Sequence, residues 1–257
     1  MLQSLESRTL LSAAVDFDTI GGVLSVTGSE KPDRIEVAVS SSPLYSLASG
    51  VGTATKRTSW GAEPGNYVNV FSEGRLVYQT FLPGKTLQQI NLNGAGSGDT
   101  LLACKFESPV VTVVLGEDGN DQIDVANFGG GGETQVFAGS GNDLVRAAGQ
   151  TKVGFLVWGE DGDDTIYGSA ANDTIFGDVD DRLMFGPRGY VGDDVIYGGA
   201  GDDYLCGCEG SDQLYGEAGD DFLDGEGGAD MLDGGAGEDI AVFDPLDKII
   251  NIEVTTK

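Results

Sequence analysis

Aspartate recurs at a fixed spacing in the second half of the chain, and its carboxylate is the functional group there that is best suited to bind a ligand. Between residues 159 and 242 an Asp occupies the sixth position of successive nine-residue units, of which GGAGDDYLC and GEAGDDFLD are typical. Relaxed units extend back to Gly116, and degenerate ones surround Asp33 and Asp99. Oxygen-rich sites suit a hard divalent cation, and Ca2+, with its flexible coordination, fits them better than Mg2+. The ten regular sixth-position residues are the candidate metal ligands: Asp121, Asp143, Asp164, Asp173, Asp194, Asp203, Asp212, Asp221, Asp230 and Asp239.

The acidic residues are concentrated in this repeat region. The chain has 42 Asp and Glu against 14 Lys and Arg, a net charge of −28, and residues 116–242 hold 29 of the acids but only 4 of the bases. Such a segment repels itself unless cations neutralise it. The charge also argues against nucleic acid or an anionic membrane surface as a partner, because affinity for phosphates comes from Lys and Arg.

Several enzyme and membrane classes are excluded by composition. The chain has no histidine, so a Ser-His-Asp triad, a Cys-His pair and an HExxH zinc site are all ruled out. It contains no run of 18 apolar residues, so no membrane-spanning helix is predicted.

The nine-residue period also predicts the elements that must position the aspartates. Each unit has Gly at its first position, usually Gly at its fourth and an apolar residue at its eighth. Glycine permits a tight turn, and the last three residues then form a short strand whose eighth residue points inward. Two units make one coil, and coils stacked about 4.8 Å apart give an all-β, parallel β-solenoid in which aspartates 18 residues apart share an edge.

Counting units assigns the aspartates to two edges. One edge would hold Asp203, Asp221 and Asp239 together with the upstream residues Asp121, Asp143 and Asp164, and the other would hold Asp173, Asp194, Asp212 and Asp230. The unit from Gly177 to Arg188 is distorted and has Arg182 where Asp is expected. It is either an interrupted metal row, in which the guanidinium replaces a cation, or a plain loop insertion. Upstream, spacings of 22 and 21 residues predict one metal-type turn per coil.

Four segments are predicted from these patterns. Residues 1–20 form an N-terminal targeting or disordered segment, and residues 21–93 form a β cap with a hairpin at 67–81. Residues 94–242 form the β-roll, and residues 243–257 form a C-terminal cap. The caps are needed because an open solenoid end exposes apolar core and unpaired strand edges.

The repeat resembles the GGxGxDxUx nonapeptide of RTX (repeat-in-toxin, haemolysin-type) proteins. The resemblance implies a right-handed parallel β-roll with stacked Ca2+-binding turns, in which the sixth-position aspartates and turn carbonyls bind several Ca2+ ions. It implies an extracellular or cell-surface location, where calcium sites of roughly 10⁻⁴–10⁻³ M affinity are filled. Ala171 and Arg182 depart from the pattern. The segment from Leu5 to Ser12 is similar to the LEPR-xLL segment of large secreted or surface bacterial proteins, with Ser7 in place of Pro.

The favoured hypothesis is a secreted, non-enzymatic Ca2+-binding β-roll whose folding depends on the ion. A calcium-dependent adhesin or extracellular matrix module that binds a glycan or a surface protein is the alternative. A polysaccharide-active enzyme is the third and least favoured, because the regular aspartates already have a metal role. Cys206 and Cys208 are too closely spaced for a usual zinc site and are interpreted as bystander thiols. Aromatic residues at ninth positions predict a stacked ladder rather than a sugar platform: Tyr167, Phe176, Tyr197 and Tyr215.

Overall fold

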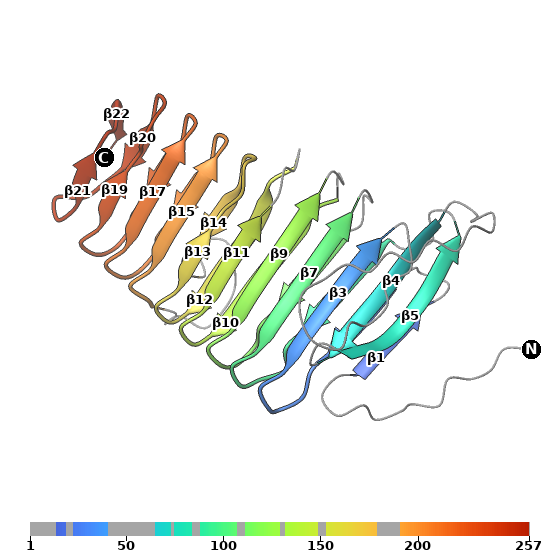
Figure 1. The fold of residues 1–257 in the computed structure, drawn as a ribbon. Helices are drawn as coiled ribbons and strands as arrows, with labels where there is room; N and C mark the ends of the chain where they lie inside the picture. Colours follow the sequence, from blue (N-terminus) through green and yellow to red (C-terminus); the bar gives the residue numbers. More distant parts are fainter. Residues whose placement is uncertain are drawn as a thin grey trace, which may run out of the picture.

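The regular structure consists of β-strands stacked into two facing sheets (Figure 1). The computed structural model describes residues 14–18, 23–40, 65–72, 75–83, 88–106, 111–128, 132–148, 153–178 and 191–256. Within these residues no helix has the length and apolar character needed to cross a membrane.

Each sheet has eleven strands, and the chain alternates between the two along most of its length. Sheet I runs in the order β1 (Ala14–Asp18), β2 (Val23–Thr27), β6 (Gln89–Asn93), β8 (Val111–Leu115), β10 (Thr134–Ser140), β12 (Phe155–Asp161), β14 (Thr174–Phe176), β16 (Tyr204–Cys206), β18 (Phe222–Asp224), β20 (Ile240–Val242) and β22 (Val254–Thr256). Sheet II runs in the order β21 (Lys248–Ile250), β19 (Met231–Asp233), β17 (Gln213–Ala218), β15 (Val195–Ala200), β13 (Thr165–Tyr167), β11 (Leu144–Ala148), β9 (Gln122–Phe128), β7 (Thr100–Phe106), β3 (Arg34–Ser40), β4 (Gly65–Ser72) and β5 (Arg75–Pro83).

The strands of the repeat region pair in parallel and in register, which confirms the predicted β-solenoid. In sheet II, Ile166, Ile196 and Leu214 are aligned across β13, β15 and β17. These eighth-position side chains have no exposed surface and belong to the main hydrophobic core between the sheets. The sequence therefore builds the core one apolar residue per unit, as the period predicts.

The interruption after β14 is an insertion within one turn. β13 pairs with β15 and β14 pairs with β16, so the coils on either side of it are direct neighbours. Asp194 therefore follows Asp164 on one edge, 30 residues later, where the regular interval is 18. The excess of 12 residues lies within the turn between β14 and β15, which confirms the reading as a loop insertion.

The predicted edge assignment is wrong downstream of this turn. Because the insertion does not advance the chain by half a coil, Asp194, Asp212 and Asp230 share the edge of Asp164. Asp203, Asp221 and Asp239 instead share the edge of Asp173. Asp194 takes the place assigned to Arg182, and Arg182 itself lies outside the described residues, as does the segment from Leu5 to Ser12.

The two ends of the stack differ. At the N-terminal end β4 and β5 form the predicted hairpin, which pairs antiparallel with β3 (Figure 1). β2 and β3 already pair in parallel with β6 and β7, so the parallel stack begins with them. At the C-terminal end β21 and β22 complete the sheets, and Phe243 and Ile252 pack against the core.

Candidate metal centre

The aspartates form two continuous rows, one along each edge of the solenoid. In both, the backbone N–H of one Asp donates to Oδ1 of the Asp in the next coil, at 2.6–2.9 Å. The long row, before the strands of sheet II, comprises Asp33, Asp99, Asp121, Asp143, Asp164, Asp194, Asp212 and Asp230. The short row, before the strands of sheet I, comprises Asp173, Asp203, Asp221 and Asp239. All ten predicted aspartates lie in these rows.

Four carboxylates extend the rows beyond the predicted set. Asp33 and Asp99 begin the long row, and the signal for them in the sequence is the degenerate unit around each. Asp247 accepts the N–H of Asp230 at 3.1 Å, and Glu253 accepts the N–H of Asp239 at 2.9 Å. These last two lie outside the repeat, so its pattern gives no signal for them.

The second carboxylate oxygen of most row members is buried and has no partner. Ten aspartates have an Oδ2 without a hydrogen bond, and their side chains are 0–3% exposed. An unpaired buried charge of this kind is costly, so each such oxygen requires a cation or a proton. The ten are Asp99, Asp121, Asp143, Asp164, Asp194, Asp203, Asp212, Asp221, Asp230 and Asp239.

Nine of the ten free oxygens lie beside the glycine at the first position of their turn, and Asp143 is the exception because Ala138 occupies that position. A Cβ on Gly198 would lie 2.5 Å from Asp203 Oδ2 and 2.9 Å from the carbonyl oxygen of Gly216 in the next coil. A Cβ on Gly94 would lie 2.5 Å from Asp99 Oδ2 and 2.6 Å from a carbonyl oxygen of the next coil. Carboxylate and carbonyl oxygens thus converge on one cradle in turn after turn, which is the donor set that Ca2+ prefers.

Backbone carbonyls are needed to complete any such site. In the described part of the chain, no three carboxylate or thiol side chains converge closely enough to hold an ion. Adjacent coils of a row contribute two carboxylates, and the remaining ligands must come from the turns. That turn carbonyls supply the rest of the shell stays a prediction.

The first member of each row differs from the others. Asp173 Oδ1 accepts the N–H of Phe155 at 2.6 Å, and its Oδ2 accepts the N–H of Ser169 at 2.6 Å. Asp33 Oδ2 accepts the N–H of Ser29 in the same way. The Oδ2 of each residue is thus taken up by the amide of the serine four residues earlier, which folds back onto it.

Burial raises the pKa of the row carboxyls. Desolvation is the largest cause throughout, and it raises the pKa of Asp164 to about 9, of Asp212 to about 8 and of Asp121 to about 7. The N–H of the neighbouring Asp lowers each value, and charges in adjacent coils raise it. At neutral pH the carboxyls of Asp164 and Asp212 therefore hold protons unless a cation takes their place.

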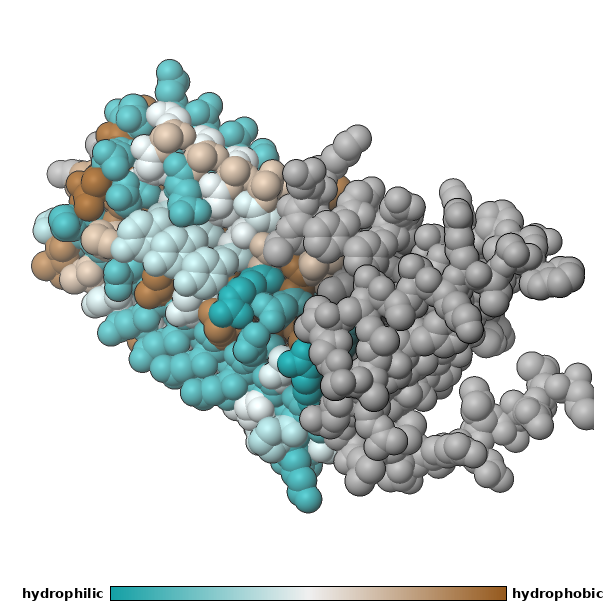
Figure 2. Space-filling model, in the orientation of Figure 1, coloured by the Kyte–Doolittle hydropathy of each residue, from teal (hydrophilic) through white to brown (hydrophobic). Residues whose placement is uncertain are grey.

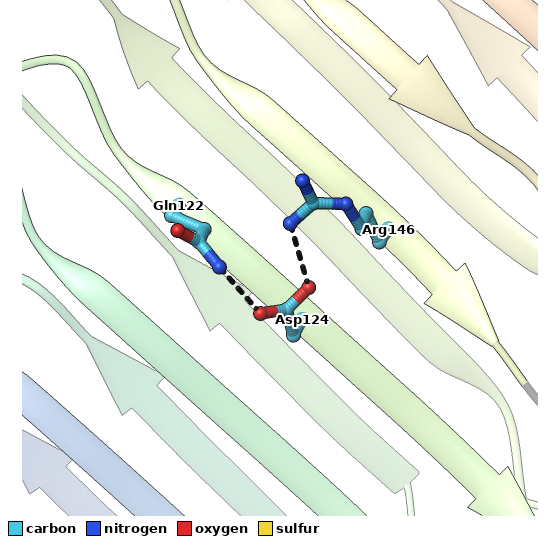
Figure 3. A network of polar contacts seen from close by, with 3 residues as sticks. All are labelled: Gln122, Asp124 and Arg146. Atoms are coloured by element: carbon cyan, nitrogen blue, oxygen red, sulfur yellow. Dashed lines mark hydrogen bonds and ion pairs between the residues drawn. The ribbon is translucent and has the colours of Figure 1, made fainter.

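No basic side chain neutralises the rows within the described residues. The contrast is Asp124, which points outward from β9: its Oδ1 lies 3.3 Å from a guanidinium nitrogen of Arg146, and its Oδ2 accepts the Gln122 amide at 2.8 Å (Figure 3). That pair is partly exposed and contributes little to stability. The row carboxylates are shielded from solvent, and among the described residues no basic side chain forms an ion pair with them. A metal ion is therefore a counter-charge that fits the rows.

The turn backbone explains the unit's pattern in more detail than the sequence does. The fourth-position glycines have positive φ, for example 132° at Gly119 and 138° at Gly210. The second position is also left-handed, even where it is not glycine, as at Glu117 and Cys208. At the first position, as at Gly198 and Gly216, the φ angles are ordinary and the glycine instead allows the close approach of the next coil, although Ala138 occupies this position in one turn.

Asp178 is an additional buried carboxylate beside the long row. It has no exposed surface, and neither of its oxygens makes a hydrogen bond. Burial raises its pKa to about 8, as do the charges of Asp194 and Asp212, while the nearby N–H groups of Gly192 and Glu209 lower it. It is at the second position of the turn that carries the insertion, so the regular sixth-position pattern does not reveal it.

The comparisons with known proteins agree with this geometry. A family model described as the RTX calcium-binding nonapeptide repeat matches in four copies, over residues 128–150, 156–183, 188–207 and 209–241. Neither a curated protein nor a solved structure matched the chain. The matched segments include the whole short row and the long row from Asp143 onward. Residues 128–241 of the chain therefore carry RTX-type calcium-binding nonapeptide repeats.

Proposed function

We propose that this is a secreted, non-enzymatic β-roll protein whose folding and stability depend on several Ca2+ ions bound along the two rows. The observation that carries the proposal is the series of ten buried, unpartnered Oδ2 atoms. Beside seven of them, a carbonyl oxygen of the next coil lies close to the same turn glycine. A bound Ca2+ ion supplies the positive charge that neighbouring carboxylates need in order to lie a few ångströms apart without protons.

The proposed side-chain ligands are the predicted aspartates together with Asp99. Asp173 is expected to contribute least, because its two oxygens already accept hydrogen bonds from Phe155 and Ser169. Oδ1 of each later Asp in a row accepts the N–H of the Asp in the preceding coil and holds the two coils in register, and its free Oδ2 is proposed to face the ion. Residues 21–93 and 243–257 are proposed to act as the caps of this roll.

Titration of Ca2+ into the chelator-treated full chain tests the proposal. Metal-free, the acidic segment is expected to lose its β circular dichroism signal, and Ca2+ is expected to restore it cooperatively. Mg2+ at the same concentration serves as the control and is expected to restore little, because it keeps its waters and requires octahedral geometry. A spectrum that is the same in EDTA and in Ca2+ would contradict the proposal.

A calcium-dependent adhesin or matrix role is the second candidate, and one surface feature favours it. Tyr167, Tyr197 and Tyr215 stack on the outer face of sheet II, with ring centroids 4.8 Å apart. Figure 2 shows a pale patch over β13–β17 bordered by hydrophilic side chains. Because the rings stack on one another, they present their edges and hydroxyl groups, which can hydrogen-bond to a glycan, and the charge of −28 restricts the ligands to neutral glycans.

A glycan array probed with the Ca2+-loaded chain separates the two candidates. Binding to neutral glycans that disappears in a Tyr197→Ala variant supports the adhesin role. Tyr→Ala changes that alter only the melting temperature support a purely structural ladder.

A further inference from the structure

Two thiols of the chain are brought together in one turn of the long row. Cys206 ends β16, and Cys208 follows Gly207 in the turn with a φ of 76°. Their Sγ atoms are 3.2 Å apart, and the side chains are 0% and 2% exposed. Cys208 has the left-handed backbone conformation that is found at the second position of other turns, and in this conformation its side chain lies next to that of Cys206.

The surroundings of the pair are apolar and acidic. Phe176, Leu156 and Trp158 pack with the two cysteines in a hydrophobic cluster separate from the main core. Glu226 Oε1 lies 3.7 Å from Cys206 Sγ. The hydrogen bond with Cys208 raises the pKa of the Cys206 thiol, as does burial, so the folded turn keeps the Cys206 thiol protonated and unreactive.

We propose that Cys206 and Cys208 are a redox site: a low-molecular-weight disulfide such as oxidised glutathione converts them to an intrachain disulfide that stabilises this calcium turn. Two S–H bonds break and one S–S bond forms, while the oxidant gains two electrons and two protons and leaves as two thiols. The sulfur atoms must move from 3.2 Å to about 2.05 Å apart. Two residues span at most about 7 Å, so the backbone is already within the range of a disulfide.

The position of the bridge connects it to the metal row; this part of the inference rests on the proposed function. Gly207 lies inside the ring, and a Cβ on it would lie 2.9 Å from Cβ of Asp212. Its N–H donates to the carbonyl of Asp224 in the next coil at 2.9 Å. A closed ring therefore orders the residue that borders the Asp212 cradle before any ion arrives.

The size of the effect follows from chain entropy. A closed loop of three residues restricts the unfolded chain only modestly, which sets the gain in apparent Ca2+ affinity at roughly tenfold at most. Oxidation is expected to be fast in EDTA, where the roll opens, and slow in Ca2+, where both thiols are buried.

The test uses the reduced full chain, incubated with oxidised glutathione in EDTA. Peptide mapping by mass spectrometry is expected to find Cys206 linked to Cys208, with the mass lowered by two hydrogen atoms. After removal of the oxidant, the midpoint of the Ca2+ titration is expected to fall several-fold, and a dithiol reductant should reverse the shift. Cys206→Ser and Cys208→Ser chains, treated identically, should show no redox-dependent shift.

Three results would overturn the inference: no linked peptide, links only between chains, or a linked peptide with an unchanged Ca2+ midpoint. Detection of the Cys206–Cys208 disulfide by peptide mapping does not depend on calcium binding. A chain that forms the bridge but never responds to Ca2+ would therefore refute the proposed function separately from the redox site.

Discussion

One aspartate in each turn has two separate tasks. Oδ1 of Asp221 accepts the N–H of Asp203 at 2.8 Å and so holds two coils in register, while its Oδ2 is buried without a partner. The neighbouring Asp220 carries the same charge but is exposed, and its Oδ1 accepts the N–H of Glu238 at 2.9 Å. Substituting these two adjacent residues one at a time therefore separates the effect of losing a metal ligand from the effect of losing a negative charge.

Asp221→Asn is expected to raise the Ca2+ concentration at the folding midpoint by about tenfold. The amide oxygen can still accept the N–H of Asp203, but an NH2 group replaces the oxygen that faces the cradle. Asp220→Asn is the matched control and should leave the midpoint nearly unchanged, since Asn occupies the equivalent position at Asn120 and Asn142. Circular dichroism during Ca2+ titration measures both, and equal midpoints would contradict the ligand role of Asp221.

At the scale of the element, the turn depends on backbone conformations that only some residues tolerate. Gly228 has a φ of 154°, and the nearest atoms to an added Cβ belong to the backbone of Gly210. Gly227 has no positive φ, and the nearest atoms to its added Cβ belong to the flexible side chain of Glu209. The two neighbouring glycines therefore differ in what they contribute to the turn.

Gly228→Ala is expected to destabilise the Ca2+-loaded chain by about 1–3 kcal/mol, because it combines a strained φ with a backbone clash. Gly227→Ala should have an effect of less than about 1 kcal/mol. Thermal unfolding in saturating Ca2+ measures both changes. A melting temperature lowered equally by the two variants would show that the left-handed turn is not the cause.

The sequence predicts the repeating element well. It does not predict on which edge of the solenoid the aspartates beyond the insertion lie. The nine-residue period identifies every row Asp between Asp121 and Asp239, because each unit is one turn and one strand. The 21 residues from Asp173 to Asp194 fit two units with three extra residues, or one unit with twelve. Only the pairing of β14 with β16 decides between them. The serine amide that satisfies Asp173 depends on turn geometry that the period does not encode.

Deleting residues 179–190 is expected to leave the roll and its Ca2+ response intact. The deletion places Asp178 directly before Val191 and restores the nine-residue interval between Asp173 and Asp194, and the parallel pairs on either side remain. Circular dichroism and Ca2+ titration of the shortened chain test this. Deleting six residues instead leaves the interval irregular and serves as the control. Loss of the Ca2+ response in the chain that lacks residues 179–190 would contradict the interpretation of this segment as a loop insertion.

At the scale of the whole molecule, the proposed function makes calcium and protons compete for the same oxygens. The pKa of Asp164 is raised to about 9, that of Asp212 to about 8, and those of Asp194 and Asp203 to about 7, mainly by burial. In the unfolded chain these groups titrate near 3.8. The metal-free folded state therefore binds more protons than the unfolded state throughout the interval between these values.

Acidification in EDTA is therefore expected to restore β structure without calcium. Since each folded pKa is raised, the metal-free fold is favoured most below the unfolded pKa and loses stability as the pH rises through the folded values. Lowering the pH from about 8 to about 5.5 should recover much of the β signal that chelation removes, and the Ca2+ dependence of the melting temperature should shrink. A chain with Asp203→Asn, Asp212→Asn and Asp221→Asn has fewer titrating groups and should show a smaller recovery. Continued loss of β signal on acidification would mean that burial of unpaired carboxylates is not what opens the metal-free roll.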